Sequence, residues 1–165
     1  MIPNHVIQEV IIVSDGSLIY SLKSNEHEAL ESSQIVIDFL SSKNENKSAV
    51  MIPKIYRELI ERARKTKNKE LERYLESFCC EARIGVSDKN PDYVEYKTVL
   101  EYLLYSHNGM IFFITSDKDC LEMAKEFKHA KLLCGDVNEV KRFIFSNDQN
   151  FYDRIFKQYY DSSSV

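Results

Sequence analysis

Short apolar runs alternate along this chain with longer segments of helical periodicity, and this alternation constrains the fold more than any other feature. The β-branched run at residues 6–13 suits a strand buried on both faces. MIFFI at 110–114 is the next clearest strand, and shorter candidates lie at 49–52, 83–86 and 130–133. The chain therefore predicts five strands separated by helices.

Helical spacing fills the intervals between these runs. Pro53 is well placed to begin one helix, Gly109 to end another, and Ser116 and Asp117 to cap a third. The β-α alternation predicts an α/β fold, a three-layer α/β/α sandwich with a central, mostly parallel sheet. The helices are expected at residues 18–40 with a polar break at 24–27, 54–64, 71–82, 93–105, 118–127 and 137–145.

Length and composition limit the class of protein. The 165 residues suit one domain, here 1–145, followed by a tail at 146–165 that is expected to be a docked helix or partly disordered. No apolar run approaches the ~18 residues that cross a bilayer, and the N-terminus lacks a signal-peptide pattern. The four cysteines have no zinc spacing and are expected to be reduced thiols, mostly buried. We therefore expect an intracellular protein of the cytoplasm or nucleus, neither secreted nor bound to a membrane.

Carboxylates follow the predicted strands, where ligands bind in open parallel sheets. Carboxylate oxygens without His or Cys suit Mg²⁺ or Mn²⁺. A site of this kind could activate water for phosphodiester cleavage. The acids that the crossovers deliver to this edge are Asp15 after the first strand, Glu58 after the second, Asp92 and Glu95 after the third, and Asp117 and Asp119 after the fourth.

Each of these acids also has a simpler interpretation. Asp15 alone reads as a turn or N-cap residue, Glu58 as a solvated helix residue and Asp117 as an N-cap. However, the register of Ile55 and Leu59 puts Glu58 beside the apolar stripe of its helix. Taken together, the acids favour one shared site.

Three stretches resemble the motifs of PIN-domain nucleases: IIVSDGSLIYSL, MIPKIYRELIERA and FFITSDKDCLEMAKEF. The resemblance covers roughly residues 6–145 and implies the PIN-like sandwich. It also implies metal-dependent endonucleolytic cleavage of single-stranded or structured RNA. Asp15, Glu58 and Asp117 would be metal ligands, Asp119 an accessory ligand, and Ser17 a support for Asp15.

The third motif of the family departs from its usual pattern here. The position expected to be acidic falls at residues 96–98, which are not acidic, so Asp92 or Glu95 would have to substitute. Two interpretations stay open: a ribonuclease completed by Asp92 or Glu95, or a PIN-like domain that has lost cleavage and binds protein or RNA. A third ranks last. VSDGSLIYS also resembles haloacid-dehalogenase phosphatases, but their nucleophilic Asp is replaced by Val13, which cannot form an aspartyl-phosphate.

A basic segment follows the second predicted strand. If it borders the acidic edge, it could hold RNA phosphates, although a solvated helix end is an equal alternative. The net charge of −4 disfavours binding through bulk charge, so a protein partner or a homodimer could supply further contacts. Tyr102, Phe112 and Phe113 are expected in the core. The residues expected to contact nucleic acid are Ser17, Lys54, Arg57, Arg64, Lys65 and Lys67.

Overall fold

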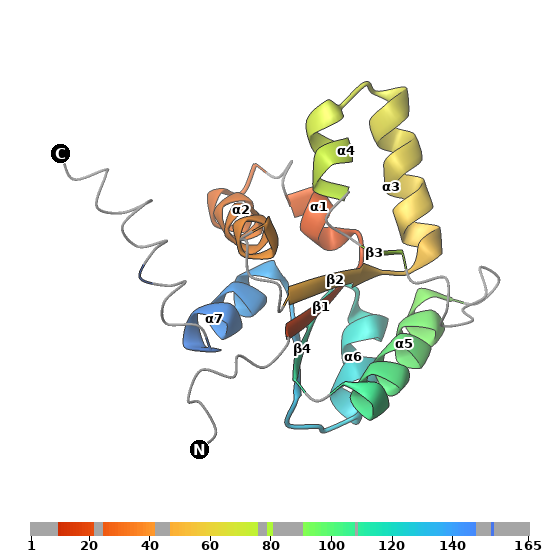
Figure 1. Ribbon diagram of the computed structural model, residues 1–165, viewed down its shortest axis with the longest axis vertical. Helices are drawn as coiled ribbons and strands as arrows, with labels where there is room; N and C mark the ends of the chain where they lie inside the picture. The colour runs from red at the N-terminus through yellow and green to blue at the C-terminus, as the bar shows by residue number, and fades with distance from the viewer. Residues whose placement is uncertain are drawn as a thin grey trace, which may run out of the picture.

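The computed structural model describes residues 10–21, 25–41, 47–75, 79–80, 91–107, 109–147 and 153. Within these ranges the chain forms one five-stranded sheet in which every recorded pairing is parallel, with strand order β3-β2-β1-β4-β5 (Figure 1). The strands are β1 (Val10–Ser14), β2 (Lys47–Met51), β3 (Cys79–Cys80), β4 (Met110–Ile114) and β5 (Leu132–Gly135).

Helices cover both faces of this sheet, so the predicted α/β fold with a parallel sheet between helical layers is confirmed. One face packs against α1, α2, α3, α4 and α7, and the other against α5 and α6. The helices are α1 (Ser17–Ser21), α2 (His27–Ser41), α3 (Pro53–Lys65), α4 (Lys69–Leu75), α5 (Asp92–Ser106), α6 (Lys118–Glu126) and α7 (Val137–Asn147).

The central strands are apolar throughout because their alternate side chains enter two separate cores. Ile12 of β1 lies in the core below α2 and α7, while the next residue, Val13, lies in the core below α5 and α6. Phe112 and Phe113 of β4 divide in the same way, and both are buried as predicted. A strand buried on both faces needs no polar alternation, which explains the continuous apolar runs.

The strand order places a topological switch point at the centre of the sheet. β1 pairs with β2 on one side and with β4 on the other, so Ser14 lies beside Ile114. The Asp15 N–H donates to the Ile114 carbonyl oxygen at 3.1 Å, and the Thr115 N–H donates to that of Gly135 at 2.9 Å. The segments that leave β1 and β4 are therefore held together at the carboxyl edge, where α/β proteins bind ligands.

Two predicted elements differ from the structure in position. The helix expected at 71–82 ends at Leu75, and Cys79–Cys80 pairs with β2 as β3. This pairing is a tertiary contact that local helical spacing does not reveal. The strand expected at 83–86 lies outside the described residues. At the far edge, β5 begins at Leu132, two residues later than predicted.

Two residues and the tail also call for comment. Gly109 does not cap α5, because the helix ends at Ser106 and His107 is its C-cap with extended backbone. Tyr102 was expected in the core but is 55% exposed. α7 continues to Asn147, so it crosses the predicted boundary at 145; apart from Asp153, the tail beyond Asn147 lies outside the described residues. Among the described residues, no helix has the length and apolar character needed to cross a bilayer.

Candidate functional site

A pocket of about 410 Å³ opens at the carboxyl edge of the sheet, beside the switch point. Carboxylates from four separate segments line it. Asp15 follows β1, Glu58 lies in α3, Asp92 begins α5, and Asp117 precedes α6. The other lining residues are Gly16, Ser17, Tyr20, Ser21, Ile55, Tyr96, Ser116 and Cys120.

Asp15 is oriented by hydrogen bonds to both of its carboxylate oxygens. Its Oδ1 accepts the Ser17 backbone N–H at 2.7 Å, which makes Asp15 the turn residue that leads into α1. Its Oδ2 accepts the Thr115 hydroxyl at 2.5 Å. Asp15 therefore has both of its predicted roles, since it forms a local turn and also presents a carboxylate to the pocket.

Thr115 connects the ends of the two central strands. Its Oγ1 donates to Asp15 and accepts the Asp117 backbone N–H at 3.0 Å. Asp117 in turn caps α6, as predicted, because its Oδ1 accepts the Cys120 N–H at 3.0 Å. This chain of hydrogen bonds fixes Asp15 and Asp117 relative to one another.

Tyr96 supports the backbone that precedes Asp15. Its hydroxyl donates to the Ser14 carbonyl oxygen at 2.8 Å, and its ring centroid lies 5.1 Å from that of Phe113. Burial, followed by the nearby charge of Asp15, raises the pKa of Tyr96 well above its usual range. The hydroxyl thus remains a proton donor at neutral pH. Tyr96 lies in the region where the PIN resemblance implies an acidic residue.

Cys120 reports the electrostatic character of the pocket. Burial, and then the charges of Asp117, Asp15 and Asp92, raise the pKa of its thiol to about 12. At neutral pH the sulfur is a neutral thiol and therefore a poor metal ligand. Three carboxylates disfavour a negative charge at one point of the wall, so the pocket suits a bound cation.

The remaining acidic candidates lie in different places. Asp92 and Glu95 both begin α5, but Asp92 lines the pocket whereas Glu95 is only 2% exposed and is not part of the lining. Asp119 is exposed and lines a separate groove between α5 and α6, together with Tyr93 and Glu126. Of the alternatives considered for completing the site, the structure places Asp92 in the pocket.

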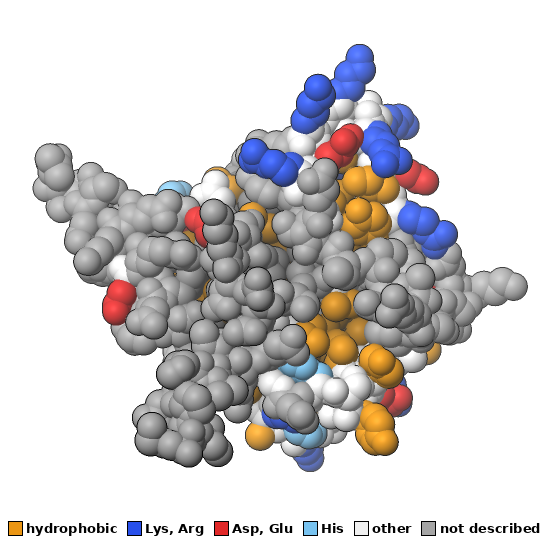
Figure 2. Space-filling view, viewed as in Figure 1, with side chains coloured by type: hydrophobic (Ala, Val, Ile, Leu, Met, Phe, Trp, Pro, Cys, Tyr) orange, Lys and Arg blue, Asp and Glu red, His pale blue; other side chains and the backbone are white. Residues whose placement is uncertain are grey.

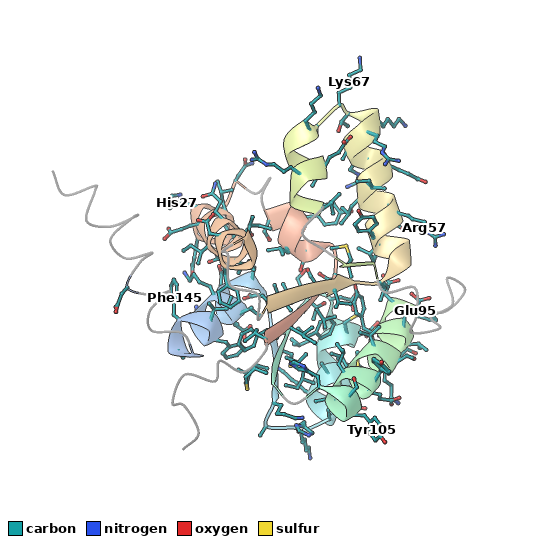
Figure 3. The ribbon with its side chains drawn as sticks, viewed as in Figure 1. His27, Arg57, Lys67, Glu95, Tyr105 and Phe145 are labelled. Atoms are coloured by element: carbon teal, nitrogen blue, oxygen red, sulfur yellow. The ribbon has the colours of Figure 1, made fainter. Side chains whose placement is uncertain are left out.

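The basic residues surround the tip of the α3–α4 hairpin. Figure 2 shows Lys and Arg side chains gathered over α3 and α4, and the exposed ones include Arg57, Arg64, Lys65 and Lys67. Arg57 projects from α3 on the side away from α4 (Figure 3). Ser17 lines the pocket, whereas these four cations do not. The side chain of Lys54 is outside the described set.

The donor chemistry of the pocket fits a hard divalent cation. Its four acids provide oxygen ligands, and each Asp15 oxygen keeps acceptor capacity beyond its single hydrogen bond. No histidine is found among the described residues of the lining. Nevertheless, within the described ranges no three His, Cys, Asp or Glu side chains are grouped closely enough to hold a metal ion together. The carboxylates line one pocket without forming a preassembled ligand cluster.

Sequence reasoning missed three residues of this site. Tyr96 had a usable signal, because it lies four residues after Asp92 and therefore on the same face of α5. Tyr20 is four residues after Gly16 in the same way. Thr115 was noted only as part of a motif, and its bond to Asp15 depends on the pairing of β1 with β4.

Comparisons with known proteins add no relative. No protein-family model matches the chain, and no curated protein or solved structure shows significant similarity to it. The functional argument therefore depends on the geometry and chemistry of the pocket.

Proposed function

We propose that this protein is a divalent-metal-dependent endoribonuclease of the PIN type, built on a PIN-like α/β/α sandwich. The observation that carries the proposal is the convergence of Asp15, Glu58, Asp92 and Asp117 on one pocket at the switch point. A purely structural origin explains one such acid at a time, as a cap or a solvated residue. It gives no reason for four of them to line the same cavity.

The ligands we propose for Mg²⁺ or Mn²⁺ are Asp15 and Asp117, assisted by Asp92 and Glu58. When bound there, the cation would activate water and stabilise the charge that develops on a scissile phosphodiester. Asp119 is not included, since it lines the separate groove.

The protein itself would orient the reacting groups. Thr115 and the Ser17 N–H fix the direction of the Asp15 carboxylate, and Tyr96 holds the carbonyl oxygen of the preceding residue. Glu58 is exposed at the pocket wall and can accept a proton from the attacking water. RNA phosphates would reach the pocket past the basic α3–α4 hairpin, with a protein partner or second copy adding contacts because the net charge is −4.

A second candidate function is a PIN-like module that binds RNA or protein without cleaving. Two observations favour it. The described acidic residues form no preassembled metal cluster, and Tyr96 occupies the region where the family resemblance implies an acid. On this alternative the Asp15 carboxylate serves only the turn and the connection to Thr115.

Cleavage of a labelled, unstructured RNA in Mn²⁺ tests the proposal. We expect wild-type activity to be abolished by EDTA and reduced at least ~100-fold by Asp15→Asn, which keeps the side-chain shape. Asp136→Asn is the matched control, because Asp136 also follows a strand and caps a helix but is absent from the pocket lining. No cleavage by folded wild type across several RNAs would favour the binding module.

A further inference from the structure

We propose that Tyr20 and Arg62 form a stacking platform for one base of a single-stranded RNA at the mouth of the carboxylate pocket. The inference rests on the proposed function and deepens it, because it specifies which form of RNA the site accepts. Tyr20 lies in α1 and Arg62 in α3, on two sides of the same opening.

Tyr20 is an exposed aromatic residue at a polar site. It lines the pocket, yet it is 46% exposed. The other large hydrophobic side chains that are exposed in the described part of the chain are Tyr93, Tyr102 and Tyr105, all on α5. Stability gives no reason to present an aromatic ring beside four carboxylates, but stacking on a nucleobase does.

Two neighbours fix the orientation of the Tyr20 ring. The guanidinium carbon of Arg62 lies 5.2 Å from the ring centroid, within the range of a cation–π contact. The ring also packs closely over Gly16, where an added Cβ atom would lie 2.8 Å from Cε2 of Tyr20. A ring held in place before RNA arrives loses little side-chain entropy on binding.

The face of α3 that reaches the pocket continues into Arg62. Ile55 and Glu58 line the pocket, and Arg62 follows Glu58 by four residues, about 6 Å further along the helix axis. Lys65 is exposed and lies three residues beyond Arg62 on the same side. A base on Tyr20 would thus lie between the carboxylates, which would hold the cation, and the cations that attract phosphates.

This arrangement favours a single strand over a duplex. A ring can stack on a base only when that base has left its neighbours, and the bases of a duplex are paired and stacked on one another. Arg62 adds a planar group that stacks on bases and also attracts phosphate. The platform should therefore accept bases of any sequence but reject paired RNA.

Because the chain contains no tryptophan, Tyr20→Trp places a unique fluorophore on the platform. The measurement uses the Asp15→Asn background in Mg²⁺, so that the RNA stays intact. We expect a short single-stranded RNA to quench this fluorescence, and the same sequence in a duplex to leave it unchanged. Tyr105→Trp is the control, since Tyr105 is 93% exposed at the last turn of α5 and should not respond.

Affinity measured by anisotropy of labelled RNA, in the same background, provides a second readout. Removing one stacked base should weaken Kd roughly 5- to 100-fold in Tyr20→Ala, whereas Tyr20→Phe, which keeps the ring, should stay within about twofold. Arg62→Gln should also weaken binding, more than the charge control Lys125→Gln in the last turn of α6.

These results separate the inference from the proposed function. Quenching and a Tyr20→Ala defect support the platform even if wild type never cleaves RNA. Cleavage by wild type without quenching, or with Tyr20→Ala binding as tightly as the ring-bearing protein, would overturn the platform and leave the nuclease. Equal binding of duplex and single strand, or no RNA binding at all, would also overturn it.

Discussion

Thr115→Val should loosen the connection between the two central strands. Thr115 is 1% exposed, and valine nearly matches its shape, so the substitution removes the hydroxyl with little change in packing. Two hydrogen bonds are lost: the one donated to Asp15 Oδ2 at 2.5 Å and the one accepted from the Asp117 N–H at 3.0 Å.

The expected cost follows from the two bonds. A hydrogen bond to a charged group contributes about 1.5–3 kcal/mol and a neutral one about 0.5–1.5 kcal/mol. Asp15 is only partly buried, so water can replace part of the first bond, and the loss should be about 2–3 kcal/mol in the free energy of unfolding. For a domain of this size, such a loss lowers Tm by about 4–12 °C.

Urea denaturation of two comparison variants isolates the hydroxyl. Thr115→Ser keeps both bonds and should lose only about 1 kcal/mol for the missing methyl group. Thr98→Val removes a hydroxyl that bonds to its own helix on the surface and should change stability by less than about 0.5 kcal/mol. If Thr115→Val matched wild type, or Thr115→Ser were as unstable as Thr115→Val, the proposed connection would be refuted.

Three further predictions concern the walls of the pocket. Tyr96→Phe should cost about 1–2 kcal/mol of unfolding free energy because the Ser14 carbonyl oxygen loses its donor, and unchanged urea midpoints would contradict this. The thiol of Cys120 has a folded pKa of about 12 against an ordinary 9.0, so the folded state keeps a proton that the unfolded state releases and stability falls as pH rises from 9 to 12. Between pH 9 and 10.5, wild type should lose about 2 kcal/mol more than Cys120→Ala, and parallel pH profiles would contradict this. In the RNA cleavage assay, Asp92→Asn should reduce the rate about 10- to 100-fold and Asp119→Asn less than about threefold, while the reverse order would place the site in the other groove.

Much of the sheet could be predicted because its strands are buried on both faces. MIFFI at β4 has the predicted bounds, and β1 ends within one residue of its predicted end. β3 could not be predicted, since Cys79–Cys80 follows a segment of helical spacing and becomes a strand only by pairing with Val50 and Met51. Tyr102 was misplaced because apolar and aromatic residues occur all round α5, which leaves its buried face ambiguous.

The candidate site shows the same division between topology and packing. Carboxylates that follow parallel strands meet at one edge, so the sequence could bring Asp15 and Asp117 together. It could not choose between Asp92 and Glu95, which are three residues apart at the start of one helix. The rotation of α5 decides between them: Tyr96, Val99 and Leu103 pack into the core, Glu95 is buried, and Asp92 faces the pocket.

Binding of Mn²⁺ to the protein in the absence of RNA tests the central claim most directly, because it asks whether the four carboxylates form a cation site at all. A calorimetric titration would compare wild type with Asp15→Asn, Asp117→Asn and the control Asp136→Asn. The account predicts saturable binding to wild type and Asp136→Asn that is lost or at least ~10-fold weaker in both pocket variants. No saturable binding to wild type, or equal binding by all four proteins, would contradict it.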